Sequence, residues 1–144
     1  MLPALLTPRV LGDKSLDSQF IKVISEYDII GLSELHTDKL LSIPGFVRLS
    51  KEMHPKNRNS SKMSGGIAVL IRQHLADNFQ VIPNDNIDSI WIKTIDKYLG
   101  GQGIYFGFFY CSPSNPLSNF FNVLRRKLIC LIISVTLIFG DFNA

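Results

Sequence analysis

Residues 135–144 read VTLIFGDFNA, an apolar run that leads directly into a Gly-Asp-Phe-Asn-Ala segment. The run predicts a buried strand over about residues 135–139, so that Asp141 and Asn143 follow the end of that strand. In extended backbone, residues two apart point to the same side, so the carboxylate and the amide would share one side. A Gly-Asp-x-Asn segment is also typical of a plain turn, and spacing alone leaves this alternative open.

A second acidic group stands at a similar place earlier in the chain. Residues 28–33, DIIGLS, predict a short buried strand, and Glu34 follows at its carboxyl end. Ligands of open α/β sheets collect at the carboxyl ends of strands. Carboxylates there can share a hard cation such as Mg²⁺, which prefers oxygen ligands and keeps waters for a phosphate substrate. The sequence therefore predicts a divalent-cation site that joins Glu34 and Asp141.

Composition limits the classes of protein to consider. The chain has 144 residues, 46% of them hydrophobic and 19% charged, with a formal net charge of +3, which predicts one folded domain over residues 1–144. Cys111 and Cys130 cannot build a disulfide scaffold or a zinc ribbon, and no signal peptide is recognisable, so we expect an intracellular protein. The apolar run 128–139 has 12 residues, too few for a membrane span, so no membrane partner is expected.

The remaining pattern predicts a sheet-rich α/β fold with helices outside. Leu16 to Ile24 have near-helical spacing after Asp13 and Ser15, which can cap, and predict a helix of about ten residues. A second helix is expected with Phe120, Phe121, Leu124 and Leu128 on its apolar face. Strands are predicted over residues 67–71, 79–82, 89–95 and 104–110, of which 89–95 alternates as a half-buried strand would.

Positive charge is concentrated between residues 48 and 72, where six Lys and Arg face only Glu52 and give a formal charge of +5. Residues 55–64 are polar without periodicity and predict an exposed loop. Such a loop suits phosphate contacts along a nucleic acid, although it could equally be a solubilising loop. The candidate nucleic-acid contacts are Lys56, Arg58, Lys62 and Arg72.

Five segments in this order resemble the endonuclease domain of LINE-type (non-LTR) retrotransposons, a branch of the endonuclease/exonuclease/phosphatase superfamily. They are DIIGLSE (28–34), SGGIAVLI (64–71), DSIWIK (88–93), YCSP (110–113) and FGDFNA (139–144). The resemblance implies a partial four-layer α/β sandwich of the deoxyribonuclease I-like type. It also implies Mg²⁺- or Mn²⁺-dependent cleavage of DNA, a nuclear location, and a larger polyprotein with reverse transcriptase.

The resemblance assigns roles residue by residue. Glu34 is similar to the metal-binding glutamate, and Tyr110 to a tyrosine that approaches the scissile phosphate. Asp141 is similar to the aspartate that orients the attacking water, and Asn143 to the amide that donates to the transition state. These types suit phosphoryl transfer, which depends on positioning and on neutralising charge. For Tyr110, packing of an aromatic ring in a strand is an equal alternative.

The sequence also departs from the pattern of this group. Residues 7–12 stand where an Asn-Gly motif is expected, and Arg9 cannot replace its metal-binding Asn. The Asp and His that complete the catalytic set after FGDFNA are absent, which predicts an incomplete domain, inactive or impaired, with Phe106, Phe108, Phe109 and Leu137 exposed. Two alternatives stay open: a non-catalytic relic or basic nucleic-acid-binding module, and a phosphatase of the same superfamily.

Overall fold

The chain is described from a computed structural model, which places residues 3–6, 17–33, 35, 42–51, 54–55, 63–64, 66–83, 89–95, 103–110, 121–122, 124–126 and 135–141. The elements in chain order are β1 (Pro3–Leu6), α1 (Ser18–Ile24), β2 (Ile29–Ser33), β3 (Phe46–Lys51), β4 (His54–Pro55), β5 (Met63–Ser64), β6 (Ile67–Arg72), the 3-10 helix η2 (Gln73–Asn78), β7 (Phe79–Ile82), β8 (Ser89–Thr94), β9 (Tyr105–Tyr110) and β10 (Thr136–Asp141). Residues 121–122 and 124–126 are helical.

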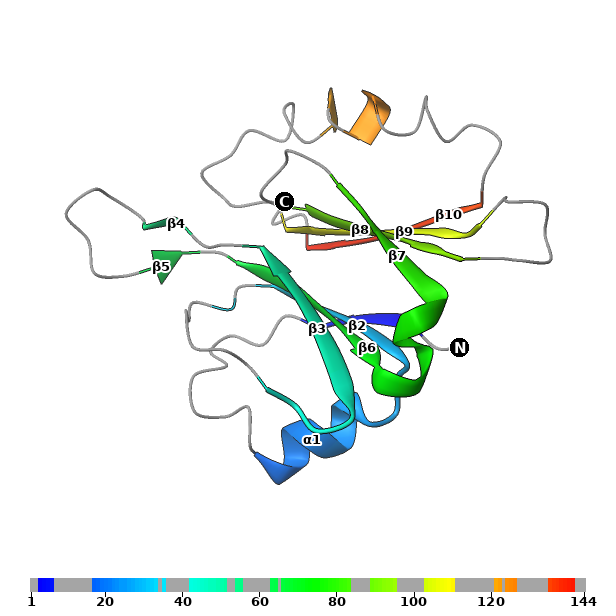
Figure 1. Cartoon of the computed structure of the whole chain (residues 1–144). Helices are drawn as coiled ribbons and strands as arrows, with labels where there is room; N and C mark the ends of the chain where they lie inside the picture. Colours follow the sequence, from blue (N-terminus) through cyan, green and yellow to red (C-terminus); the bar gives the residue numbers. More distant parts are fainter. Residues whose placement is uncertain are drawn as a thin grey trace.

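Two four-stranded sheets are stacked face to face, with helical segments on the outside (Figure 1). One sheet has the order β1-β2-β6-β3 and is covered by α1; the other has the order β10-β9-β8-β7 and is covered by the helical residues 121–126 that are described. A two-stranded ribbon, β4-β5, stands apart from both. This order of layers confirms the α/β fold expected from the sequence, a partial four-layer sandwich.

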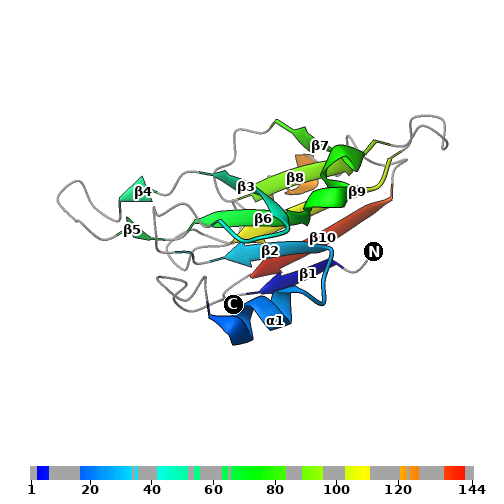
Figure 2. The same cartoon turned by 60° about the horizontal axis from the view of Figure 1, so that its bottom comes forward.

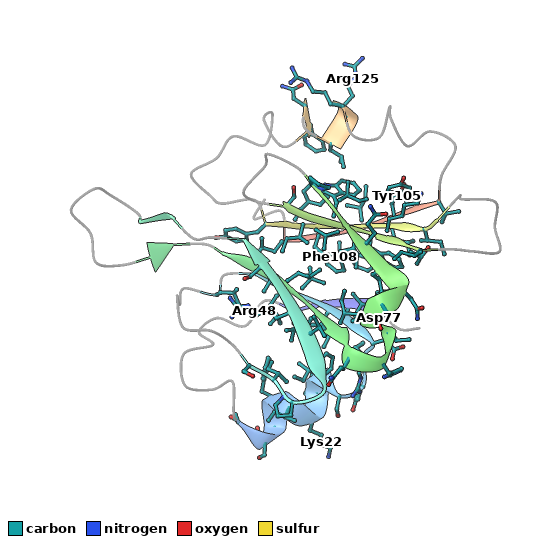
Figure 3. The ribbon with its side chains drawn as sticks, viewed as in Figure 1. Lys22, Arg48, Asp77, Tyr105, Phe108 and Arg125 are labelled. Atoms are coloured by element: carbon teal, nitrogen blue, oxygen red, sulfur yellow. The ribbon has the colours of Figure 1, made fainter. Side chains whose placement is uncertain are left out.

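The space between the sheets holds the largest apolar cluster. Phe108 lies there, fully buried, and stacks on Phe139 with ring centroids 5.3 Å apart (Figure 3). The prediction that Phe106, Phe108 and Phe109 are exposed is wrong, because the first two face the other sheet and Phe109 faces the helical layer. Leu137 is 40% exposed, as predicted. The inner faces of the two sheets therefore pack against each other and bury Phe106 and Phe108.

Helix α1 closes the outer face of the first sheet. It is shorter than predicted, seven residues, and its N-cap is Asp17, whose carboxylate accepts a hydrogen bond from the Gln19 backbone N–H at 2.8 Å. The predicted caps Asp13 and Ser15 lie outside the described residues. Ile24 is fully buried and packs with Ile30 of β2 and Leu70 of β6. One apolar stripe of this short helix therefore joins it to the sheet.

The opposite outer face has its own small core. Trp91 of β8 is 1% exposed and meets Phe109 of β9 edge to face at 5.3 Å, and Leu124 packs against this pair. The predicted half-buried pattern of residues 89–95 is therefore wrong for its first four residues, which are buried on both faces. Of the predicted apolar helix face, Leu124 packs here and Phe121 is 59% exposed, while Phe120 and Leu128 lie outside the described residues.

Most predicted strands are present within one or two residues. The pattern did not predict β3, in which Arg48 and Lys51 interrupt the apolar run; its pairing with β6 defines it as a strand. The two-residue strands β4 and β5 occupy the ends of the predicted loop, and residues 56–62 lie outside the described part. Within the described residues, no helix has the length and apolar character needed to cross a bilayer.

Candidate active site

In the first sheet, the last residues of β2 and β3 lie beside the first residue of β6, at the edge where these strand ends meet. The register pairs Ser33 with Ile67 and Ile67 with Lys51, so the carboxyl ends of β2 and β3 flank the amino end of β6. Ser33 is fully buried, and its place in the alternation of β2 directs it toward the space between the sheets, as for Ile29. Glu34 is the next residue along the chain.

In the second sheet, Tyr110 and Asp141 are neighbours on parallel strands. They are the last residues of β9 and β10 and are paired in register. On the other side of β9, Phe109 is opposite Ser89, the first residue of β8. The carboxyl ends of β9 and β10 and the amino end of β8 therefore meet at one edge of this sheet.

The two edges lie on the same side of the molecule. In Figure 1 and in Figure 2, β2 and β10 both run toward the left of the view, where the β4-β5 ribbon also projects. Contacts of β1 with β10 and of β2 with β9 hold the sheets together near these strands. We call the joined ends of β2, β3, β9 and β10 the strand-end edge. Ser33, the residue before Glu34, and Asp141 are the last residues of β2 and β10 and belong to it.

Two of the predicted site residues, Glu34 and Asn143, lie outside the described residues, and for Asp141 only the backbone is described. The described part of the chain contains no cluster of three His, Cys, Asp or Glu that could hold a metal ion. The donor set nevertheless fits a hard divalent cation, because the residues at these two strand ends offer carboxylate oxygens. The meeting of their side chains stays a prediction.

Tyr110 is placed at the strand-end edge but is mostly covered. It is 5% exposed, and its ring belongs to the cluster between the sheets, as the packing alternative predicted. A phenol at the last position of β9 is next to the predicted phosphate site in register, yet its ring contributes to the core. The role of Tyr110 at a phosphate stays a prediction.

The four basic candidates separate into two groups. Lys56, Arg58 and Lys62 belong to residues 56–62, outside the described part, between the two strands of the β4-β5 ribbon. Arg72 lies at the far end of β6 from the strand-end edge, in register with Phe46.

The guanidinium of Arg72 is already engaged there. Its Nε donates to the Tyr27 carbonyl at 3.2 Å, its Nη2 donates to the Ser25 carbonyl, and it lies 4.8 Å above the Phe46 ring. The structure therefore does not bring Arg72 together with the other candidates, and its contacts fasten the end of α1 to the sheet.

Sequence reasoning missed the two buried hydroxyl residues of this edge, Ser33 and Ser89. Both are fully buried, and both make interactions. A serine at the end of an otherwise apolar strand was the available signal, and it is weak because serine is common in turns.

Two solved structures share this fold. One is the endonuclease domain of TRAS1, a telomere-specific non-LTR retrotransposon, with a TM-score of 0.61 and 14% identity over 97% of this chain. The other is an endonuclease/exonuclease/phosphatase family protein from Bacteroides thetaiotaomicron, with a TM-score of 0.60 and 15% identity over 97% of this chain. The chain spans 58% and 62% of their lengths. No protein-family model matches the chain, and no curated protein sequence does. The fold expected from the sequence motifs is therefore confirmed.

Proposed function

We propose that this chain is part of an endonuclease/exonuclease/phosphatase-type hydrolase that cleaves DNA phosphodiester bonds with a divalent cation. One observation carries the proposal: β2 and β10, whose carboxyl ends lead to Glu34 and to Asp141 with Asn143, end on the same side of two stacked sheets. The shared fold with the TRAS1 endonuclease domain supports this reading. In this proposal, Glu34 and Asp141, which are 107 positions apart along the chain, act at the same edge.

Each residue has a defined task in the proposal. Glu34 holds the cation, Asp141 orients the attacking water, and Asn143 donates its amide N–H to a phosphate oxygen. The cation, Mg²⁺ or Mn²⁺, would supply neutralisation of charge on the phosphate. Tyr110 stands beside Asp141 in register, where its hydroxyl would help to position the phosphate.

The basic segment adds a way to hold DNA. The β4-β5 ribbon projects on the side of the strand-end edge, and Lys56, Arg58 and Lys62 belong to the segment between its strands. Such cations neutralise backbone phosphates without reading sequence. Three phosphate contacts predict that log K falls with log salt concentration with a slope of about −2.7.

The decisive experiment measures nicking of supercoiled plasmid by the 144-residue chain in Mg²⁺. Glu34→Gln and Asp141→Asn keep side-chain size but remove charge, and we expect each to slow nicking by about 10²-fold or more. Glu26→Gln and Asp77→Asn are matched controls, because both carboxylates are exposed and neither belongs to the strand-end edge. Nicking that survives both site variants, or that persists in EDTA, would refute the assignment.

A second function is favoured by the stretch of residues 48–72, which has a formal charge of +5. A non-catalytic binding module predicts salt-dependent DNA binding without nicking. In that case Arg58→Gln should weaken binding, while Arg125→Gln, an exposed cation on the outer helical layer in Figure 3, should not. If the chain is instead part of a phosphatase, we expect it to release phosphate from a soluble phosphomonoester and to leave the plasmid intact.

A further inference from the structure

The two fully buried serines of the described residues both lie at the strand-end edge. Ser33 is the last residue of β2, and Ser89 is the first residue of β8. The other buried side chains of these two strands are aliphatic or aromatic. A hydroxyl in such surroundings is unfavourable unless it has a hydrogen-bond partner, and both serines make interactions. Each hydroxyl is therefore part of the local structure at this edge.

The two serines face different layers of the sandwich. Ser33 has the same place in the alternation of β2 as Ile29, which belongs to the cluster between the sheets. Ser89 has the same place in the alternation of β8 as Trp91, which belongs to the small core under the helical layer. They thus have the same side chain, the same burial and the same edge, and differ in the layer that they face.

Ser33 stands where the chain leaves the first sheet. The pairing of β1 with β2 ends at Leu6 and Leu32, one residue earlier, and Ser33 itself is paired with Ile67 of β6. The next residue is Glu34. The conformation of the backbone at Ser33 therefore sets the direction in which the chain continues to Glu34, and the pairing described at this residue holds it from one side.

We propose that Ser33 is a positioning residue for the divalent cation, an inference that rests on the proposed function. Its buried hydroxyl is hydrogen-bonded at the strand-end edge and fixes the backbone from which Glu34 leaves β2, so that the carboxylate is oriented toward the cation. Ser33 acts through Glu34 and does not bind the cation itself. Groups that orient a metal ligand in this way typically change metal affinity by about 10–100-fold when they are removed.

A packing role for Ser33 makes the opposite prediction. Threonine and valine have nearly the same shape and differ in one hydroxyl, so this pair of substitutions separates the hydroxyl from the volume of the side chain. If Ser33 only fills space between the sheets, valine serves at least as well as threonine, because it buries apolar surface without removing a hydroxyl from water. If the hydroxyl positions Glu34, threonine retains cation affinity and valine loses it.

Binding of Mn²⁺ to the 144-residue chain, followed by electron paramagnetic resonance of the free ion, tests the proposal. We expect Ser33→Thr to bind Mn²⁺ nearly as the unchanged chain does, and Ser33→Val to have a dissociation constant about tenfold or more higher. The melting temperature of Ser33→Val should be no lower than that of Ser33→Thr. Ser89→Thr and Ser89→Val are the matched control pair, and we expect them to have equal dissociation constants.

The outcomes separate this proposal from the proposed function. If Glu34→Gln abolishes Mn²⁺ binding while the two Ser33 variants bind equally, the positioning role is overturned and the cation site remains. If Glu34→Gln leaves Mn²⁺ binding unchanged, the cation site and the positioning role both fail. A tenfold difference within the Ser89 pair would also contradict the proposal, because any buried hydroxyl of this edge would then have the same effect.

A smaller substitution guards against overpacking by the added methyl groups. Ser33→Ala removes the hydroxyl without adding volume, and it should weaken Mn²⁺ binding to about the same extent as Ser33→Val. In the nicking assay it should raise the Mg²⁺ concentration that gives half the maximal rate. An alanine variant with the Mn²⁺ affinity of the unchanged chain would overturn the proposal.

Discussion

Substituting Gly107 by alanine tests how tightly the outer core around Trp91 is packed. Gly107 is in the middle of β9, opposite Trp91 of β8 and next to Ile138 of β10. A Cβ atom there would lie 2.9 Å from Trp91 Cη2 and Cζ3 and 2.9 Å from Phe109 Cε2. Both rings are 1% exposed and meet edge to face, so neither can move without losing its own contacts.

The expected cost follows from this overlap. An extra carbon atom in a close-packed core lowers the free energy of unfolding by about 1–3 kcal/mol. For a domain of this size, that lowers Tm by about 2–12 °C in calorimetry. A change in Tm below 1 °C would refute the packing described here.

A double-mutant cycle identifies the ring responsible. Trp91→Phe removes the Cη2 and Cζ3 atoms, so Gly107→Ala should cost less in that background, with a coupling of about 0.5–2 kcal/mol. Gly45→Ala is the control, because it has a φ of +81° but nothing within 4 Å of the added Cβ, so its cost is one of backbone conformation. Its cost should be independent of Trp91, and additivity in the Gly107 cycle would exclude the ring contact.

Three further substitutions probe single interactions by urea denaturation. Arg72→Ala should lower the free energy of unfolding by about 1–2 kcal/mol, because two carbonyls at the end of α1 lose their hydrogen-bond donor. Arg72→Lys should recover less than half of this loss, and full recovery would mean that only the charge matters. Asp17→Ala should lower the free energy of unfolding by about 1 kcal/mol, because it removes the N-cap of α1, while Asp17→Asn should leave it nearly unchanged. Equal losses for the two variants would contradict a capping role. Arg48→Met should leave the free energy of unfolding unchanged or raise it by about 1 kcal/mol. Burial lowers the pKa of the Arg48 guanidinium, its Nη2 donates to Ser50 Oγ, and its Nε and Nη1 are buried with no hydrogen-bond partner among the described residues; a loss above about 1 kcal/mol would show that the charge is satisfied.

The local sequence pattern was sufficient to predict those elements whose burial depends on their own residues. β6 and β7 were predicted within one residue, because a short segment rich in apolar, β-branched residues and bounded by glycine or polar residues is typical of a strand. The layered fold was predicted from the resemblance of five ordered segments, FGDFNA among them, to a known endonuclease family, and not from a local pattern alone.

Where an element's environment comes from a distant partner, the pattern was misleading. Residues 89–95 alternate, yet Trp91 is buried because Leu124 covers it from another layer. β3 has no strand pattern of its own, and its hydrogen bonds to β6 define it. Phe106 and Phe108 are buried because β2 and β6, from the other half of the chain, face them.

The sequence alone determined most of the strands and the acidic residues near the ends of two of them, because these depend on neighbours a few positions away. Only the tertiary structure decided that β2 and β10 end on one side and that Arg72 lies at the opposite end of its sheet. Strand direction and order depend on pairing between residues far apart in the chain, which no local periodicity encodes.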